Sequence, residues 1–343
     1  MRSRIPEVIR DMTFEIYNPY DNQIVTTHYV DIITQGIMKA GFNIQAIDTI
    51  SCSKDNKSRG IVVISPFDVI RARLAGYRYV LFWSQGLAAE ESYMRNGSHI
   101  RFQLIKAASK YALKRADITF LVSDAMREFY RKEYGVMLGK TVVMPCFNEE
   151  VGNMLPLDQR CGNVFLYAGG LAPWQCFEET VDLYRAVEEQ VEDASFLVLV
   201  KDRERAERIL KAAGVVHYEI DYVSHEQLQR RIQGVSYGFC LREDNPVNNV
   251  ATPTKLSTYV ANGIVPICSK ALIDFCSVSK HSRAVIQVSS VPVSSDDRDR
   301  IVSYCKSPLD REEICRDFLA CFGRYYSTET YVGEIAEQVK ELV

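Results

Sequence analysis

Two cationic side chains, Arg242 and Lys255, stand in a segment whose spacing suits the binding of a phosphorylated ligand. Arg242 ends an apolar run, and Lys255 falls in the first turn of a predicted helix, after a suitable N-cap (Thr252) and a proline at the first helical position (Pro253). A lysine there opposes the helix dipole, whose amino end already carries about half a positive charge. An anion would relieve this conflict, and charge-assisted hydrogen bonds of roughly 1.5–3 kcal/mol each could hold a diphosphate. The alternative is a lysine that extends into water from an ordinary helix start.

The glycine-rich turn YAGGLAPWQ, at residues 167–175, also suits a phosphate. Gly169 and Gly170 remove two side chains where an apolar run turns towards a helix. Backbone N–H groups could therefore approach a phosphate at the positive end of that helix. The alternative is a tight turn that needs positive φ and binds no ligand.

One acidic pair resembles a metal site, but we interpret it as a helix start. Asp297 and Asp299 form a DxD pair, and hard oxygen ligands of this kind suit Mg²⁺ or Mn²⁺. The pair follows Ser294 and Ser295, where a helix is predicted to begin, and the helix dipole favours acids in a first turn.

The cysteines do not indicate a metal site either. There are ten in 343 residues, without a CxxC pair or a His/Cys cluster of zinc-like spacing. We predict no metal. Several have apolar neighbours, which is typical of buried thiols in a reducing compartment: Cys240, Cys268, Cys276 and Cys321.

The elements that would position these groups alternate along the chain. Short runs rich in Val, Ile, Phe and Tyr are separated by helix-length amphipathic stretches, a pattern typical of parallel sheets covered on both faces. The fold class is therefore α/β, with two doubly wound, Rossmann-like domains facing each other across a cleft. The strands are expected at 14–18, 42–47, 60–65, 79–83, 118–123, 141–146, 163–169, 195–200, 217–222, 237–242, 264–269 and 284–289.

The domain boundaries follow from a polar segment between the two sets of strands. Residues 147–162 contain Gly, Pro and acids without periodicity, which predicts a linker. We expect a first domain over 1–150 and a second over 151–325. An amphipathic helix within 326–343 is expected to pack back on the first domain.

Composition and charge argue against several classes of protein. The chain has 47% hydrophobic and 25% charged residues, within the globular range, and no apolar stretch near the roughly 18 residues of a bilayer span. Its start lacks the apolar run of a secretory signal, so we expect a cytoplasmic protein. The net charge of -3 argues against nucleic acid as a partner.

One stretch is locally basic. Residues 95–132 hold nine basic against three acidic side chains. At 100° per residue, Lys106, Lys110 and Lys114 form one row of a predicted helix. The basic helix over 101–115 could touch anionic lipid at the inner face of the cytoplasmic membrane, or it could be a solvated face. The opposite, apolar face is expected to hold Ile100, Leu104, Ala108 and Ala112.

Several of these segments together resemble bacterial glycosyltransferases of family 4, of the capsule and O-antigen type. The run NPVNNVATPTKLSTYVANGIVPI resembles their donor-site segment, and YAGGLAPWQ resembles their glycine-rich loop. WSQGLAAEESYMRNGS and KRADITFLVSDAMREFYRKEYG resemble their amino-terminal half. The resemblance covers roughly residues 14–340 and implies a GT-B fold, with the acceptor in the first domain and a nucleotide sugar in the second.

The resemblance assigns candidate donor-binding residues to the second domain. Tyr222 and Val223 come just beyond a strand, where the family contacts the base through the backbone. Ser224 and Gln227 fit a capping box, so we interpret Ser224 and His225 as a helix start. The full candidate donor set is Gly169, Gly170, Leu171, Tyr222, Val223, Arg242, Asn245, Asn248, Asn249, Thr254, Lys255 and Thr258.

This sequence also departs from the family's pattern. The arginine and lysine that grip the diphosphate in many members appear here as Gly170 and Gln175. The usual pair of glutamates appears as Val250 and Thr258. We therefore expect Arg242 and Lys255 to bind the diphosphate through their positive charge, and the asparagines to recognise the hydroxyl groups of the sugar.

In the first domain, the resemblance points to the segment after the fourth strand. Trp83, Gln85 and Gly86 are expected to position the acceptor, and His28 could touch it. Glu90 or Glu91 could take the proton of an acceptor hydroxyl as general base. The alternative for this pair is a loop acid that caps the following helix.

The sequence therefore predicts a glycosyltransferase, hexosyl or deoxyhexosyl, that moves a sugar from a nucleotide-sugar co-substrate to a bacterial surface polysaccharide or a lipid-linked oligosaccharide. No cofactor is expected, and the resemblance implies retention at the anomeric carbon. Arg242 and Lys255 would stabilise the departing diphosphate. Two alternatives remain: a catalytically silent GT-B subunit that partners another transferase, and a nucleotide-sugar epimerase.

Overall fold

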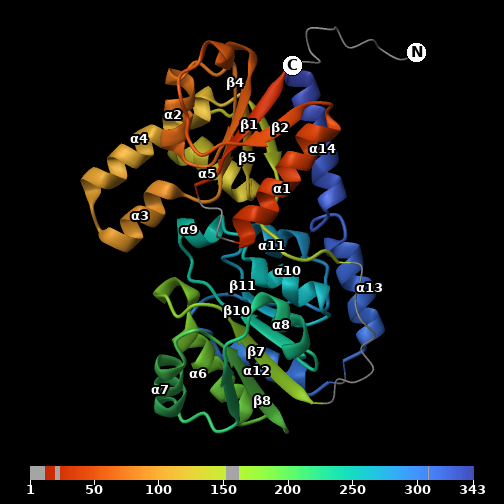
Figure 1. Cartoon of the computed structure of the whole chain (residues 1–343). Helices are drawn as coiled ribbons and strands as arrows, with labels where there is room; N and C mark the ends of the chain where they lie inside the picture. Colours follow the sequence, from red (N-terminus) through yellow and green to blue (C-terminus); the bar gives the residue numbers. More distant parts are fainter. Residues whose placement is uncertain (1–11, 20–23, 152–161, 308) are drawn as a thin grey trace. The chain divides into compact units, whose positions relative to one another are not determined.

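The computed structural model describes residues 12–19, 24–151, 162–307 and 309–343, which fold into two compact units, each built on a parallel sheet (Figure 1). Unit 1 comprises Met1–Cys146, Val250–Thr252 and Ser327–Val343, and unit 2 comprises Phe147–Asn249 and Pro253–Tyr326. Most of the predicted linker, residues 152–161, lies outside the described residues.

The sheet of unit 1 has six parallel strands in the order β2-β1-β3-β4-β5-β6. The central strands β3, β4 and β5 are almost entirely buried, which explains their unbroken apolar sequences. The chain reverses its direction across the sheet between β1 and β3, where a doubly wound sheet binds ligands. The strands are β1 (Thr13–Tyr17), β2 (Asn43–Ala46), β3 (Gly60–Val63), β4 (Tyr79–Ser84), β5 (Ile118–Leu121) and β6 (Lys140–Val143).

Serine N-caps start four of the helices of unit 1, at Ser65, Ser98, Ser123 and Ser327. The carboxyl-terminal helix α14 lies along α1 (Figure 1), and Gly36 gives Ile335 the room to approach. The helices are α1 (Ile24–Lys39), α2 (Pro66–Leu74), α3 (Ala88–Asn96), α4 (His99–Arg115), α5 (Asp124–Glu133) and α14 (Thr328–Leu342), with a 3-10 turn, η2 (Lys54–Ser58).

The sheet of unit 2 also has six parallel strands, in the order β12-β11-β10-β7-β8-β9. Counted from β7, this is the Rossmann order 3-2-1-4-5-6, in which the chain reverses between its first and fourth strands. The strands are β7 (Asn163–Ala168), β8 (Ala194–Leu199), β9 (Tyr218–Asp221), β10 (Tyr237–Cys240), β11 (Val265–Ser269) and β12 (Ile286–Val288).

Aromatic side chains form much of the core of unit 2. Phe165 stacks on Tyr237 with ring centroids 4.7 Å apart, and Tyr184 stacks on Phe196 at 4.5 Å. The helices are α6 (Phe177–Glu188), α7 (Arg203–Ala212), α8 (His225–Arg231), α9 (Pro246–Asn249), α10 (Thr254–Ala261), α11 (Ile273–Val278), α12 (Ser295–Cys305) and α13 (Arg311–Phe322), with a 3-10 turn, η3 (Pro173–Gln175).

The predicted α/β architecture is confirmed, and each of the predicted strand segments overlaps one of these strands. The structure also shows an arrangement that the sequence did not predict. Val250 packs in the core of unit 1, and its carbonyl oxygen accepts a 2.7 Å hydrogen bond from Ser123. The chain between α9 and α10 therefore belongs to unit 1, although both helices belong to unit 2.

The faces of α4 differ from the prediction. Ala108 and Ala112 are buried as expected, whereas Ile100 and Leu104 are 78% and 63% exposed. In an α-helix, residues four apart lie about 40° past one full turn from each other. From Ile100 to Ala112 the position around the helix therefore shifts by about 120°, so the four residues do not share one buried face. Within the described residues, none of the helices combines the length and hydropathy needed to cross a bilayer.

Candidate donor and acceptor sites

Several candidate donor residues of unit 2 lie where the order of its strands reverses, between β7 and β10. The glycine-rich turn follows β7, Arg242 follows β10, and these two strands are neighbours. In doubly wound sheets, the loops at this point open a crevice beyond the carboxyl ends of the strands. The topology thus brings together two segments that lie about 70 residues apart in the chain.

Arg242 and Lys255 converge on one oxygen atom. Arg242 Nη2 donates a 2.8 Å hydrogen bond to Gln175 Oε1, and Lys255 Nζ donates to the same atom at 3.4 Å. Arg242 Nη1 donates to the Leu241 carbonyl oxygen at 2.8 Å. Lys255 Nζ also lies 4.7 Å from the centroid of the Tyr167 ring. The two cations therefore point towards the same place, which is the arrangement that a diphosphate requires.

Among the described residues, no carboxylate pairs with either of these two cations. Arg242 is only 5% exposed, and within the described parts of the chain neither side chain forms an ion pair. Burial, followed by the neighbouring Arg242 charge, lowers the pKa of Lys255 to about 8. The charged form of the lysine is therefore held in an unfavourable environment. A bound polyanion would supply the missing negative charge.

The glycine-rich turn closes against Lys255. Gly169 has φ of +149°, and a Cβ atom on it would lie 3.1 Å from Lys255 Nζ. The hydroxyl of Tyr167 donates to the carbonyl oxygen of Gly170, which holds the turn. Gly169 and Gly170 are exposed and Leu171 is partly buried. Glycine is needed at position 169 for both its backbone conformation and the approach of the lysine.

The side chains of the three predicted asparagines form hydrogen bonds within their own loop. Asn245 Oδ1 accepts from the Asn248 backbone N–H at 3.0 Å, and Asn248 Nδ2 donates to the Glu243 carbonyl oxygen at 3.0 Å. Asn249 Nδ2 donates to Asp244 Oδ1 at 2.9 Å. These bonds form the short helix α9. The contact of the asparagines with a sugar stays a prediction.

The start of α10 differs from the predicted one. Thr252 is not the N-cap, because the helix begins at Thr254 with Pro253 as its cap residue. The Thr252 hydroxyl instead accepts a 3.0 Å hydrogen bond from the Cys146 backbone N–H. Lys255 still lies in the first turn. Of the predicted threonines, Thr254 is partly buried and Thr258 is buried.

The residues predicted to contact the base follow β9, which lies at the edge of the sheet beyond β8. Tyr222 is 55% exposed, so its ring is accessible, and Val223 is partly buried. The predicted start of α8 is confirmed, since Gln227 Oε1 accepts from the Ser224 backbone N–H at 3.2 Å. A contact of Tyr222 and Val223 with a base stays a prediction.

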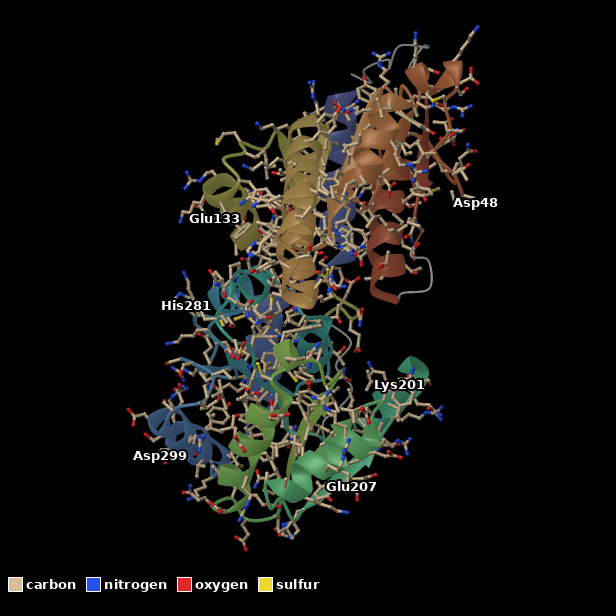
Figure 2. All side chains as sticks on the ribbon, turned by 90° about the vertical axis from the view of Figure 1, so that its left-hand side faces the viewer. Asp48, Glu133, Lys201, Glu207, His281 and Asp299 are labelled. Atoms are coloured by element: carbon tan, nitrogen blue, oxygen red, sulfur yellow. The ribbon has the colours of Figure 1, made fainter. Side chains whose placement is uncertain are left out.

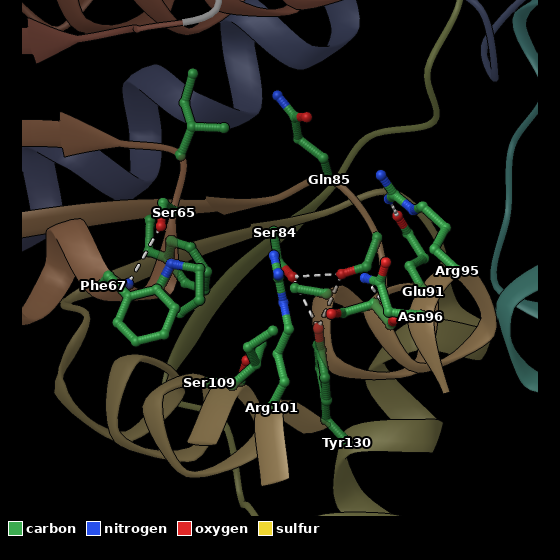
Figure 3. A pocket seen from close by; sticks show the side chains of 17 residues that line it. Ser65, Phe67, Ser84, Gln85, Glu91, Arg95, Asn96, Arg101, Ser109 and Tyr130 are labelled. Atoms are coloured by element: carbon green, nitrogen blue, oxygen red, sulfur yellow. Dashed lines mark hydrogen bonds and ion pairs between the residues drawn. The ribbon is translucent and has the colours of Figure 1, made fainter. Parts of the chain in front are cut away.

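Unit 1 contains a pocket of about 600 Å³ at the carboxyl ends of β3 and β4 (Figure 3). Its lining includes two predicted acceptor residues, Gln85 and Gly86, and one predicted base, Glu91. A Cβ on Gly86 would lie 2.0 Å from Glu91 Oε1, so glycine lets this carboxylate lie against the loop. The lining also includes residues for which no binding role was predicted, among them Ser84, Arg95, Asn96, Arg101 and Tyr130.

The structure separates the acidic pair. Glu91 lines the pocket and forms a 3.0 Å ion pair with Arg95. Glu90 turns to Tyr134, whose hydroxyl donates to its two carboxylate oxygens at 3.2 and 3.0 Å. Burial raises the pKa of Glu90, although the Tyr134 hydrogen bond and Lys106 oppose this shift. Glu91 is therefore the better placed of the two to accept a proton from a bound hydroxyl.

Trp83 and His28 do not line this pocket. Trp83, the last residue of the predicted strand 79–83, was expected to help position the acceptor, but it lies within β4 and is 1% exposed. Its ring stacks on Tyr29 with centroids 3.9 Å apart. Alternate residues of a strand point to opposite faces, and position 83 points into the core. His28 is partly buried within α1.

Asp297 lies in the first turn of α12, as predicted, and Asp299 lies two residues further along the helix. Asp297 accepts a 2.7 Å hydrogen bond from the Ser289 backbone N–H and pairs with Arg300. Asp299 is exposed and points outward (Figure 2). In the described residues, His, Cys, Asp and Glu form no group of three or more that could hold a metal ion.

Two doubly wound units of this topology define the GT-B fold of glycosyltransferases, and solved structures with this fold match the chain. Sucrose-phosphate synthase from Thermosynechococcus elongatus matches with a TM-score of 0.67 at 13% identity, over 97% of this chain and 99% of that one. The lipopolysaccharide outer core galactosyltransferase WaaB has a TM-score of 0.67 at 12% identity, with the same coverage.

TarM from S. aureus, solved in a complex that includes UDP, matches with a TM-score of 0.61 at 9% identity. The match covers 84% of this chain but 56% of TarM, so the chain spans little more than half of that protein. No protein-family model matches the sequence. No curated protein matches it either.

Proposed function

We propose that this protein is a glycosyltransferase that moves a hexosyl or deoxyhexosyl group from a nucleotide sugar to a saccharide acceptor. The observation that carries the proposal is the pair Arg242 and Lys255, which share one neutral amide oxygen and have no carboxylate partner in the described residues. The GT-B fold supports it. TarM, which is similar in fold, was solved with UDP, and this supports a nucleoside diphosphate as the leaving group.

In the proposed reaction, the bond between the anomeric carbon and the diphosphate oxygen breaks, and the electron pair leaves with the diphosphate. Arg242, Lys255 and the backbone of the glycine-rich turn stabilise that developing charge. The acceptor oxygen forms the new bond to the anomeric carbon, and Glu91 takes its proton. Side chains provide the positive charge, so the mechanism uses no cofactor. The family resemblance implies retention of configuration, which requires the acceptor oxygen to approach the anomeric carbon from the same face that the diphosphate leaves.

The acceptor in this proposal is a bacterial surface polysaccharide or a lipid-linked oligosaccharide. WaaB acts on lipopolysaccharide outer core and WaaG is involved in lipopolysaccharide biosynthesis, and both are similar to this chain in fold. The polar pocket of unit 1 is large enough for saccharide residues. We place the acceptor there, with Gln85 at its hydroxyl groups.

A lipid-linked acceptor would bring the protein to the inner face of the cytoplasmic membrane, and α4 offers a surface for it. Ile100, Leu104 and Tyr111 are exposed on one side of this helix, where spacings of four and seven residues align them. Lys114 follows on the same side. Lys106 is partly buried beside Tyr134, with Nζ 4.9 Å from the ring centroid, so it contributes less to such a surface. The membrane contact we propose is thus an apolar stripe with a basic end.

Thermal unfolding with a panel of nucleoside diphosphates and their sugars tests the donor site. A ligand at 100 times its Kd adds about 2.7 kcal/mol to stability. We expect one nucleotide family to raise the Tm, and Arg242→Gln to abolish the rise. Arg283→Gln is the matched control, because the side chain of Arg283 is 90% exposed. No rise with any nucleotide, or an equal rise in Arg242→Gln, would contradict the proposal.

Release of the nucleotide from its sugar distinguishes an enzyme from a silent subunit. A glycosyltransferase without acceptor hydrolyses its donor slowly, and it transfers the sugar when the acceptor is added. Binding without either reaction would instead indicate a catalytically silent GT-B subunit. Interconversion of the free nucleotide sugar would indicate an epimerase.

A further inference from the structure

The pocket of unit 1 contains a cation that no side chain of the described residues neutralises. Three charged side chains line the pocket, and two of them, Glu91 and Arg95, pair with each other at 3.0 Å. The third, Arg101, points into the pocket from the first turn of α4 (Figure 3). In the part of the chain that the structure describes, its guanidinium has no hydrogen-bond or ion-pair partner, and only its backbone N–H is bonded, to Ser98. The lining therefore carries one uncompensated positive charge.

The other lining groups suit a sugar. Gln85 is exposed at the end of β4, and no side-chain hydrogen bond holds its amide among the described residues. Asn96 donates through Nδ2 to the Ser92 carbonyl oxygen, which leaves its own amide oxygen available. Phe67 is 47% exposed and offers an apolar face on which a sugar ring can pack. Amide groups beside an aromatic ring are the contacts that a saccharide needs, because its rings have apolar faces and hydroxyl edges.

We propose that the saccharide bound in this pocket carries an anionic substituent, a carboxylate or a phosphate ester, which Arg101 holds through its guanidinium. Arg95 is not available for this role, because Glu91 already binds it. A planar guanidinium can form two parallel hydrogen bonds to either group. The assignment of this saccharide as the acceptor rests on the proposed function, whereas its charge follows from the pocket alone.

Three small probes measured by titration calorimetry test this inference: methyl β-D-glucoside, methyl β-D-glucuronide and glucose 1-phosphate. We expect at least one anionic probe to bind about tenfold more tightly than the neutral glucoside, which corresponds to about 1.4 kcal/mol. Arg101→Gln should reduce this preference to less than twofold. Arg127→Gln, which removes an exposed arginine of α5 outside the pocket, should leave it unchanged. A preference for the glucuronide alone identifies a carboxylate, and one for the phosphate alone identifies a phosphate ester.

Equal binding of the three probes, no binding of any, or a preference that survives Arg101→Gln would overturn the inference. Glucose 1-phosphate could also bind in unit 2 through its phosphate. Only the part of its affinity that Arg101→Gln removes is therefore assigned to the pocket of unit 1. UDP binding, measured on the same samples, separates the two proposals. If UDP does not bind but Arg101 still selects anionic saccharides, the proposed transferase fails and the pocket assignment stands. If UDP binds and the preference is absent, only the inference about the pocket fails.

Discussion

Replacement of Lys255 by methionine should change stability and ligand binding in opposite directions. Methionine fills a similar volume, and its thioether replaces the ammonium group over the Tyr167 ring, but it removes the charge that lies beside Arg242. Without ligand, the protein loses an unfavourable charge and should become more stable. With ligand, it loses a hydrogen bond to the diphosphate and should bind it more weakly.

The size of the stabilisation follows from the protonation of the lysine. A pKa lowered from 10.5 to about 8 means that the folded protein disfavours the charged form by about 3 kcal/mol. This cost is fully present below pH 8, where the lysine is charged in both the folded and the unfolded state. It disappears as the pH rises towards the unfolded pKa. At pH 7 we expect Lys255→Met to raise the free energy of unfolding by about 1–3 kcal/mol, since methionine restores only part of the packing.

Thermal unfolding with and without UDP measures both effects. For a unit of this size, 1 kcal/mol corresponds to about 2–4 °C in Tm. The Tm of free Lys255→Met should therefore rise by several degrees, while its affinity for UDP should fall by about 10–100-fold, the loss of one charge-assisted hydrogen bond. Lys280→Met, at an exposed lysine of unit 2, is the matched control and should change neither quantity. A Lys255→Met protein that is less stable than the wild type and binds UDP equally well would refute the reasoning.

Three further predictions concern pH and packing. UDP affinity should fall by about tenfold from pH 7 to pH 9 in calorimetry, because Lys255 loses its proton with a pKa of about 8; a flat profile would contradict this. Gly36→Ala should destabilise unit 1 by about 1–3 kcal/mol in urea unfolding, because the added Cβ would lie 2.5 Å from Ile335 Cγ2. Gly333→Ala, which meets nothing within 4 Å, should be neutral or stabilising, and equal effects of the two changes would exclude packing as the cause. Tyr29→Phe should lower the free energy of unfolding by about 1–3 kcal/mol, because the Tyr29 hydroxyl donates to two buried carbonyl oxygens. Urea unfolding followed by tryptophan fluorescence measures this change, and an unchanged midpoint would contradict it.

The strands could be predicted from the sequence because each is a short apolar run bounded by turn residues. The run at 60–65, for example, contains β3, whose residues are all buried. The order of the strands in each sheet could not be predicted in this way, because it depends on contacts between segments that are distant in the sequence. The membership of Val250 in unit 1 is a case of this kind, since its neighbours on both sides in the chain belong to unit 2.

The convergence of Arg242 and Lys255 could also be anticipated, since each follows a strand or begins a helix at the carboxyl edge of a parallel sheet. Trp83 was expected to contact the acceptor, but in a strand covered on both faces the sequence does not show which side chains reach a pocket, and Trp83 is 1% exposed. The position of Arg101 at the pocket was not predicted, for a different reason. Arg101 lies within a basic stretch of the sequence. The sequence alone does not show which basic side chains of that stretch line a pocket and which lie on an outer surface.

The buried cationic pair also has a consequence for turnover. In the proposed reaction, the nucleoside diphosphate that leaves carries one more negative charge than it had when it was esterified to the sugar. A site that is short of negative charge will hold this product more firmly than the donor. Release of the spent nucleotide, and not bond cleavage, would then limit each catalytic cycle. Accumulated nucleoside diphosphate would slow the enzyme by competing with fresh donor, which would link its rate to how quickly the cell recycles that product.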